Sequence, residues 1–409
     1  MRKCSSLMTA MVLLAALLAG GCAVHSKTEP EKQPKERREV VLWSYYETKQ
    51  QKEGLDQLVE GFNGSQEDYI ARWEFQGPSS EFKKILSIGV AEEKLPDVVL
   101  IDNPDMRKYV ELGIFEDITS YVEENHDLTA FYPEVISSAQ YDGRFYGMPF
   151  CCNNVGLVYN KEMFRQEGMD PPVDWESFQA AAKALTAEGR YGFAMSAIME
   201  EQSSFQLLPW LLSSGEGMEE LGEDGSVRAL AMLGDMVQGG FMPKDCINWS
   251  QVDVARQFAA GKCAMMENGP WSLPLVEEAG VDYGVVKLPV DRQSVVVAGG
   301  ENFGIMKGKD VEGALALMSY YYKEDVMVSL NERMYSLPPV KCLAEQLQEK
   351  NPAYQVFAQQ MEHCISRSSY SYWPQITGVL SEGLYGVITQ EMTPEEAAAH
   401  IRDKLPEQG

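Results

Sequence analysis

The chain has 409 residues and is strongly acidic, with 61 Asp and Glu against 35 Lys and Arg and a formal net charge of −26. This balance argues against binding to nucleic acid or to an anionic lipid surface, because both attract Lys and Arg. The length and a hydrophobic content of 45% predict two domains, each with a core of its own.

The N-terminus has the layout of an export signal. Two basic residues precede an uncharged apolar run at residues 7–18, and three small residues stand directly before Cys22. This layout predicts a lipoprotein signal peptide over 1–21, because the run is too short for a permanent membrane span. A plain signal peptide or an uncut anchor is the alternative, since Ala19 stands where lipoprotein signals usually have a larger aliphatic residue.

Residues 22–38 are expected to form a flexible tether. This stretch has many charges, two prolines and almost no apolar side chains, so it cannot bury enough surface to fold. We therefore predict an exported chain that lipid on Cys22 holds at the cell membrane, on the extracellular face or in the periplasm. Periodic apolar structure begins at Val40.

Beyond the tether, apolar periodicity predicts strands and helices. An apolar run at 40–43 predicts a strand, and helical spacing follows at 55–62 and again at 82–90. The continuous apolar run at 97–101 predicts a strand that is buried on both faces. This order of strand, helix, helix and strand favours an α/β layer architecture with a largely parallel sheet.

The α/β pattern continues toward the C-terminus. Further strands are predicted at residues 146–150, 155–160, 261–266, 285–289 and 299–306. Helices are predicted from Asp174 onward, at 251–261, and through most of the tail after Trp373. Residues 393–396 form a capping box with proline at the first helical position, which is a strong helix start.

The sequence lacks the motifs of common enzyme classes. It has neither a G-x-S-x-G elbow nor a phosphate-binding loop, and its four histidines are far apart, which argues against a Ser-His or zinc site. Six cysteines remain besides Cys4 and Cys22, with no C-x-x-C motif: Cys151, Cys152, Cys246, Cys263, Cys342 and Cys364. We expect mostly buried free thiols with at most one bridge, no metal, no cofactor and no enzymatic activity. Carboxylate pairs are plentiful, so an exported glycosidase remains an alternative.

Several short motifs resemble, in their order, those of a known family. They are PDVVL at 96–100, LGIFEDI at 112–118, YGMP at 146–149, VYNKEMF at 158–164, DWESF at 174–178, FAAGKCAMM at 258–266 with GPW at 269–271, the glycine pair at 299–300 and PEEA at 394–397. Their order and spacing resemble the sugar-type extracellular solute-binding proteins of ABC importers, the family that includes maltose-binding protein. The resemblance covers nearly the whole exported part of the chain.

The resemblance implies a periplasmic-binding-protein type II fold, with two α/β lobes, a hinge of crossing strands and a ligand cleft between the lobes. The first lobe is expected to hold residues 39–148 and 296–335, and the second 149–295 and 336–409. Ligand contacts to both lobes would favour the closed state. The implied function is capture of a mono- or oligosaccharide by a monomer, which delivers it to the transmembrane subunits of an ABC permease.

The candidate ligand residues are those whose chemistry suits a sugar. Ring faces of sugars pack on aromatic side chains, and sugar hydroxyls pair with polar side chains. The candidates follow predicted strands or lie at the expected lobe crossovers: Trp43, Tyr45, Glu47, Asp102, Asn153, Asn154, Trp210, Trp271, Gly300, Glu301, Asn302 and Tyr335. Trp271 leads, because the family stacks an aromatic ring on the sugar at that position. The alternatives are core packing for the Trp and Tyr rings, and capping for the Asp and Asn side chains.

The resemblance does not carry over the identity of the ligand. Residues 151–154 read CCNN, where many family members have Ser, Asn and aromatic residues. A polyamine, a glycerophosphodiester or another small solute is therefore an alternative ligand on the same fold, and presentation of the ligand to a receptor kinase is an alternative to transport. The net acidity favours a neutral or cationic ligand.

Overall fold

The computed structural model describes residues 36–405. The predicted signal peptide, Cys22 and nearly all of the predicted tether lie outside these residues. None of the helices within 36–405 combines the length and the apolar character that a membrane span requires. The described residues form an α/β fold with two lobes, each built around a sheet of its own.

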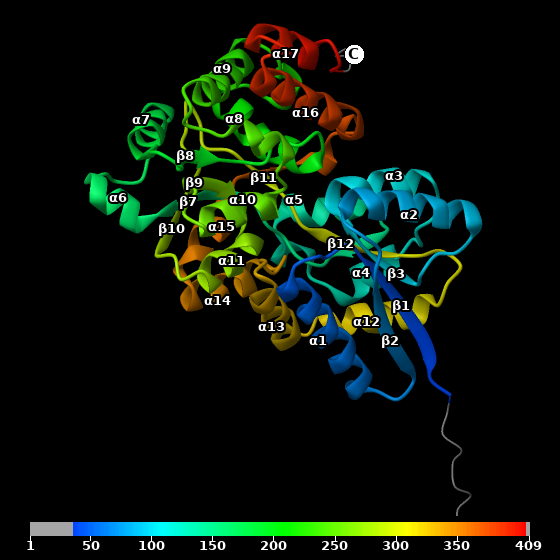
Figure 1. The fold of residues 1–409 in the computed structure, drawn as a ribbon. Coiled ribbons are helices and arrows are strands. Elements are labelled where there is room, and N and C mark those ends of the chain that lie inside the picture. Colours follow the sequence, from blue (N-terminus) through cyan, green and yellow to red (C-terminus); the bar gives the residue numbers. More distant parts are fainter. Residues whose placement is uncertain (1–35, 406–409) are drawn as a thin grey trace, which may run out of the picture. The chain divides into compact units, whose positions relative to one another are not determined.

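Five strands form the first sheet, in the order β2-β1-β3-β12-β6. They are β1 (Arg38–Ser44), β2 (Tyr69–Phe75), β3 (Val98–Asp102), β6 (Gly147–Pro149) and β12 (Glu301–Ile305). β1 is parallel to β2 and β3, whereas β12 is antiparallel to β3 and β6. The prediction of a largely parallel sheet is confirmed for β1, β2, β3 and β6, which run in one direction. β12 alone runs the opposite way, because it returns from the second lobe and enters between β3 and β6 (Figure 1).

Helices cover both faces of the first sheet and complete the first lobe. They are α1 (Lys49–Ser65), α2 (Ser79–Glu92), α3 (Met106–Glu111), α4 (Thr119–Asn125), α12 (Val311–Tyr321) and α13 (Glu324–Met334). The predicted apolar face of α1 is confirmed, since Leu55, Leu58 and Phe62 are buried. α1, α12 and α13 share one core cluster with alternate residues of β1, and α2 and α3 pack with Val99 and Ile101 on the other face.

The second sheet has the order β10-β7-β9-β8. Its strands are β7 (Gly156–Asn160), β8 (Tyr191–Ala194), β9 (Cys263–Asn268) and β10 (Tyr283–Val286). β8 is parallel to β9, and β7 is antiparallel to both β9 and β10. β10 ends earlier than the predicted strand, whose proline at position 289 lies beyond the ladder.

The second lobe is rich in helices. They are α6 (Lys161–Glu167), α7 (Trp175–Leu185), α8 (Glu201–Ser213), α9 (Asp224–Gln238), α10 (Gln251–Ala259), α11 (Leu273–Glu278), α14 (Lys341–Lys350), α15 (Pro352–Met361), α16 (Trp373–Thr389) and α17 (Pro394–Arg402). Two predicted helix starts are confirmed: Asp174 caps α7 by accepting from the Ser177 N–H, and Thr393 caps α17 by accepting from the Glu396 N–H. The helical C-terminal tail is confirmed as well (Figure 1).

Three chain segments pass side by side between the two sheets. Cys152 exchanges main-chain hydrogen bonds of 2.8 and 3.0 Å with Leu337, and the Asn153 N–H donates to the Gly299 carbonyl over 3.1 Å. Beside them, β11 (Val296–Ala298) pairs in parallel with β13 (Cys364–Ser366). These hydrogen-bonded crossings form the hinge between the lobes. The remaining short elements are α5 (Pro133–Ile136) and the hairpin of β4 (Gln140–Tyr141) and β5 (Arg144–Phe145).

All six cysteines within residues 36–405 are free thiols. Five of them are buried, and Cys342 is exposed. Burial raises the pKa of the Cys246 and Cys263 thiols to about 12, so these groups behave as small apolar side chains. The same part of the chain has no group of three or more His, Cys, Asp or Glu side chains arranged to hold a metal ion.

One carboxyl group, that of Glu267, is enclosed in the core of the second lobe. Glu267 lies in β9 and is 0% exposed, and its Oε2 accepts a hydrogen bond of 2.7 Å from the Trp210 indole N–H. Its Oε1 has no hydrogen-bond partner within the described residues. Burial raises the pKa of Glu267 well above its usual range, so the folded protein favours the protonated form of this side chain.

Glu267→Gln is therefore expected to stabilise the protein increasingly as the pH rises. The folded state holds a proton that the unfolded state releases above about pH 4.3. From that point the wild-type chain loses up to about 1.4 kcal/mol of stability per pH unit, until the folded-state pKa is reached. The stability of the amide variant does not fall in this way, because its side chain has no ionisable proton. Denaturant unfolding of both proteins between about pH 4 and about pH 8 measures the difference.

The matched control for this experiment is Glu188→Gln, which changes an exposed carboxylate. The control should follow the pH dependence of the wild-type protein at every pH. A constant difference in stability between Glu267→Gln and the wild-type protein would contradict the conclusion that Glu267 is protonated in the folded state.

Candidate ligand-binding site

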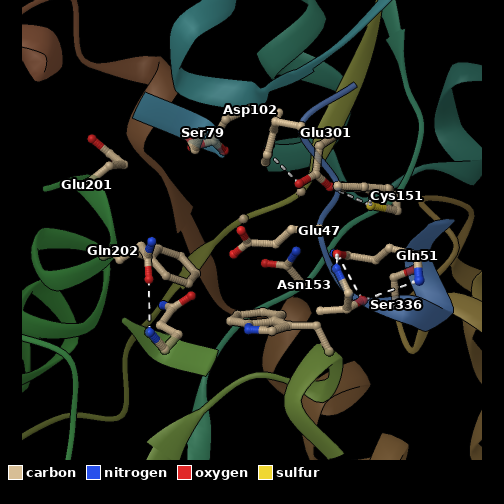
Figure 2. A pocket seen from close by; sticks show the side chains of 18 of the residues that line it. Glu47, Gln51, Ser79, Asp102, Cys151, Asn153, Glu201, Gln202, Glu301 and Ser336 are labelled. Carbon is tan, nitrogen blue, oxygen red and sulfur yellow. Dashed lines mark hydrogen bonds between the residues drawn. The ribbon is translucent and has the colours of Figure 1, made fainter. Parts of the chain in front are cut away.

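A pocket lies between the two lobes, next to the crossing segments of the hinge. Its empty volume is about 1090 Å³, open solvent included. The loops after β1 and β3 line it from the first lobe, and the starts of α8 and α10 line it from the second. Figure 2 shows its polar side chains converging from both sides.

Aromatic rings from both lobes line the pocket. Tyr45 belongs to the loop after β1, whereas Phe205 lies in α8 and Trp271 follows β9. The Trp271 ring is half-buried, and its centroid lies 6.4 Å from that of Phe205 with the planes tilted by 37°. A Cβ atom at Gly269 would come within 1.9 Å of the Trp271 ring. Glycine at that position therefore leaves the space in which the ring lies.

A hydrogen-bond network holds the aromatic side of the first lobe in place. The Glu301 carboxylate accepts from the Tyr45 hydroxyl over 2.6 Å, from the Tyr46 hydroxyl over 2.7 Å and from the Cys151 thiol over 2.9 Å. Burial, and then the Glu301 charge, raise the pKa of Tyr45, so its hydroxyl remains a donor at neutral pH. Glu301 thus fixes the rings beside it and has few lone pairs left for a ligand.

An arginine joins the two lobes at the wall of the pocket. Arg367, which is 2% exposed, donates to Glu201 of the second lobe over 2.5 Å and to Asp102 of the first lobe over 3.3 Å. Although burial acts against it, the Arg367 charge holds the pKa of Glu201 below its usual range. Burial raises the pKa of Asp102, with Arg367 acting in the opposite direction. The guanidinium is therefore committed to two protein carboxylates.

Two further carboxylates of the pocket have no such partner. Glu47 follows β1 and Glu200 precedes α8, so they approach from opposite lobes. Neither side chain has a hydrogen bond or an ion pair within the described part of the chain. Burial raises the pKa of Glu47, while the charges of Lys52 and Arg256 act in the opposite direction. Figure 2 shows Glu47 next to the Asn153 amide in the middle of the pocket.

Most of the residues predicted from the sequence line this pocket. They are Tyr45, Glu47, Asp102, Asn153, Trp271, Gly300, Glu301 and Tyr335. They come from both lobes and from the crossing segments, so residues far apart in the sequence meet in one cavity. Their contact with a ligand stays a prediction.

The other four predicted residues do not line the pocket. Their side chains pack in a core or form hydrogen bonds with other parts of the protein. The Trp43 indole packs against α2 and donates to Glu74 over 2.8 Å. Asn154 donates to the Phe357 carbonyl, and Asn302 donates to the Ser138 hydroxyl. Trp210 is 1% exposed and lies in the second core. Trp43 and Trp210 therefore pack with the cores of the protein, which was the alternative interpretation of these two residues.

Several residues that line the pocket were not predicted. They include Tyr46, Thr48, Gln51, Ser79, Cys151, Glu200, Glu201, Gln202, Phe205, Gln251, Ser336 and Arg367. Some of them carried a local signal, since Tyr46 and Thr48 adjoin predicted residues after β1. Arg367 carried none, because it meets Asp102 across 265 positions of sequence. Only the folded chain brings these two side chains together.

Comparison with known proteins gives a consistent family match. Residues 57–355 match the model of a protein family described as bacterial extracellular solute-binding protein. The sn-glycerol-3-phosphate-binding periplasmic protein UgpB of Escherichia coli K12 is 24% identical over 406 residues, which cover 88% of this chain and 89% of UgpB. A Brucella abortus (strain 2308) protein named as a binding protein is 24% identical over 255 residues, or 59% of this chain. The match spans 62% of the length of that Brucella protein.

A solved structure has the same fold. The maltose-bound MalE3 protein of T. maritima superposes with a TM-score of 0.82 at 21% identity, covering 90% of this chain and 98% of MalE3. At this identity the structural similarity establishes the fold and does not identify the ligand. The two-lobe architecture with a cleft between the lobes therefore follows from the sheets and from the superposition together.

Proposed function

Because the chain belongs to the bacterial extracellular solute-binding protein family, we propose that it is the substrate-binding component of an ABC importer. It captures a mono- or oligosaccharide between its lobes and delivers it to the transmembrane subunits of the permease. The chain acts as a monomer and binds its ligand without converting it.

One observation carries the proposal of a sugar ligand, namely that the pocket between the lobes combines aromatic rings with polar side chains. Trp271 and Tyr45 offer flat apolar surfaces from opposite lobes, which suit the two faces of a sugar ring. Asn153, Glu47 and Gln202 offer amide and carboxylate groups, which suit its hydroxyls. A ligand in contact with both lobes stabilises the closed state by its differential affinity.

The charges of the pocket argue against a phosphate ligand of the kind named for UgpB. Five carboxylates line it, those of Glu47, Asp102, Glu200, Glu201 and Glu301. Arg367 is the only Lys or Arg among the described residues that line it, and it is paired with Glu201 and Asp102. A phosphate would meet like charges and find no unpaired Lys or Arg among the described residues that line the pocket, which is unfavourable in a partly buried site.

The same charges favour a second candidate, in which the pocket binds a polyamine. Glu47 and Glu200 are unpaired within residues 36–405 and approach from opposite lobes, so two ammonium groups of one ligand would find partners. A sugar remains the better candidate, because the half-buried Trp271 ring offers a broad stacking surface that a thin polyamine chain would leave largely uncovered.

The lobe boundaries and the membrane anchor belong to the same proposal. We propose that residues 39–148 and 296–335 move as one lobe and 149–295 and 336–409 as the other, with the crossing segments as the hinge. The chain is exported with a signal peptide over 1–21 and anchored by lipid on Cys22, and the predicted tether over 22–38 leads into β1, whose first residue is Arg38. This arrangement keeps the ligand-binding lobes close to the membrane permease.

A thermal-shift screen of the whole chain tests the proposed function. The panel holds mono- and oligosaccharides, polyamines, sn-glycerol 3-phosphate and glycerophosphocholine. A ligand that binds only the folded state raises the melting temperature. At a concentration of 100 times its Kd, the ligand stabilises the folded state by about 2.7 kcal/mol. We expect the largest shift with a sugar that is recovered intact. A shift with polyamines alone would replace the ligand class, and recovery of a cleaved sugar would favour the exported glycosidase.

A further inference from the structure

A second cavity adjoins the ligand pocket at its mouth. This outer groove has an empty volume of about 1360 Å³, open solvent included, and it shares Ser79, Glu200, Glu201 and Gln202 with the pocket. Two of these shared residues, Ser79 and Glu201, are labelled in Figure 2. Because the two cavities adjoin at these residues, the outer groove is the nearest space for a ligand longer than the pocket.

The outer groove adds lysines to the two carboxylates, Glu200 and Glu201, that it shares with the pocket. Lys83 and Lys84 of α2 and Lys108 of α3 line it from the first lobe. Lys83 forms an ion pair of 2.7 Å with Asp105. Lys84 and Lys108 are exposed, and neither has a carboxylate partner within residues 36–405. Two cationic groups are thus available in a chain whose net charge is −26.

The outer groove also offers apolar surface from both lobes. Ile88 of α2 is 56% exposed and Met199, which precedes α8, is 58% exposed. Large apolar side chains this exposed are uncommon in the described part of the chain. Thr377, Gly378 and Ser381 of α16 also line the groove from the second lobe, and residues this small leave the groove open. The groove can therefore contact both an apolar ring face and an anionic substituent.

We propose that the outer groove is a subsite for an acidic sugar, so that the ligand is an oligosaccharide with a neutral unit in the pocket and a carboxylate- or sulfate-bearing unit beside Lys84 and Lys108. This inference rests on the proposed function and names the substrate class within it. The acidic pocket rejects the charged unit and the lysines of the groove attract it, so the ligand enters in one orientation. The residues that the two cavities share place the groove directly beside the pocket, which favours an extension of the ligand over a separate macromolecule.

Matched probes test the charge of the ligand. Titration calorimetry of the whole chain compares 3′-sialyllactose with its methyl ester, and 3′-sulfated lactose with lactose, so that each probe offers neutral units to the pocket and at most one acidic group to the outer groove. Each pair differs in charge and shares its sugar units, and the two pairs distinguish carboxylate from sulfate. We expect an acidic oligosaccharide to bind about tenfold more tightly than its neutral form, because it makes two additional ion pairs. This preference should weaken with salt, as exposed ion pairs do.

Two double variants locate the effect. Lys84→Gln with Lys108→Gln is expected to weaken binding of the acidic probe about tenfold and to leave its neutral form unchanged. The control, Lys307→Gln with Lys309→Gln, removes the same charge from exposed positions that line neither cavity, and it should change neither affinity. Equal melting temperatures of the free proteins confirm that the variants are folded.

The outcomes separate this inference from the proposed function. Binding of neutral sugars that equals or exceeds binding of the acidic forms would overturn the acidic subsite and leave a sugar-binding protein. A charge preference that survives in the Lys84 and Lys108 variant would overturn the placement of that subsite in the outer groove. Failure of every sugar in both screens would overturn the proposed function and this inference together.

Discussion

Trp271→Ala is expected to weaken ligand binding about 30-fold or more and to leave the free protein folded. Trp271 lines the pocket and is only half-buried, so its ring contributes more to the ligand surface than to the core. Removal of a tryptophan at the centre of a binding site typically costs at least about 2 kcal/mol, which corresponds to about 30-fold in Kd. Calorimetry with the best ligand of the screen measures this loss.

Gly269→Ala tests the position of the same ring without removing it. The backbone of Gly269 has φ −98°, which any residue adopts, so the substitution adds no backbone strain. Its new Cβ would lie 1.9 Å from the present Trp271 ring, and the ring must therefore move. We expect the affinity to fall toward that of Trp271→Ala. Gly64→Ala is the control, since a Cβ at Gly64 meets no atom within 4 Å.

These two variants have a result that would contradict the role given to Trp271. If both retain the wild-type affinity, the ring lies in the pocket without contacting the ligand. If Gly269→Ala alone retains it, the ring contacts the ligand but binds equally well from a shifted position. Loss of folding in Trp271→Ala, seen as a lower melting temperature of the free protein, would instead assign the ring to the core.

The contrast between Trp271 and Trp210 shows how far the local sequence predicts whether a tryptophan lies in the pocket or in the core. Trp271 follows a glycine and a proline at the end of β9, where the chain turns, and turns after strands commonly carry binding residues. Trp210 lies within α8, among neighbours that are all buried. That apolar run indicates a core position, and the structure places Trp210 there, with its indole N–H on Glu267. A family pattern and local burial together separate the two tryptophans.

The sequence did not predict elements that depend on pairing with strands far away along the chain. β2 (Tyr69–Phe75) was missed, and the expected order of strand, helix, helix and strand omits it. Its sequence, YIARWEF, mixes charged and apolar residues, because an edge strand buries few of its side chains. The antiparallel direction of β12 was also not predicted, since β12 pairs with β3 about 200 positions away. Local periodicity predicts that a segment forms a strand. It does not predict which strand lies beside it or in which direction the two run.

The ion pairs at the pocket wall illustrate the same limit for the site. Asp102 was predicted because it follows a buried strand, whereas Arg367 lies in a short turn with no distinguishing pattern. Once they are folded together, Arg367 forms ion pairs with Asp102 and Glu201 and is no longer available to an anion. The preference for a neutral or cationic unit in the pocket, expected from net charge alone, has its specific cause in this pairing.

Gly300→Ala is expected to destabilise the protein by about 3 kcal/mol or more. Gly300 has φ +122°, a backbone conformation that L-residues with a side chain rarely adopt and that costs about 1–3 kcal/mol. A Cβ there would lie 2.2 Å from the Cys151 carbonyl oxygen and 2.7 Å from the Cys152 Cα. These are backbone atoms of a crossing segment in the hinge, so they cannot turn away as a side chain would. Denaturant unfolding measures the loss.

The control for Gly300 is Gly308→Ala. Gly308 also has a positive φ, of +75°, but a Cβ there meets no atom within 4 Å, so the cost should be the left-handed conformation alone, about 1 kcal/mol. An equal loss in both variants would mean that the crossing segments can separate to admit a methyl group. In the expected case Gly300→Ala also weakens ligand binding, because Gly300 lines the pocket and accepts the Asn103 N–H over 3.0 Å. The close contact of the crossing strands would then fix both the hinge and one wall of the site.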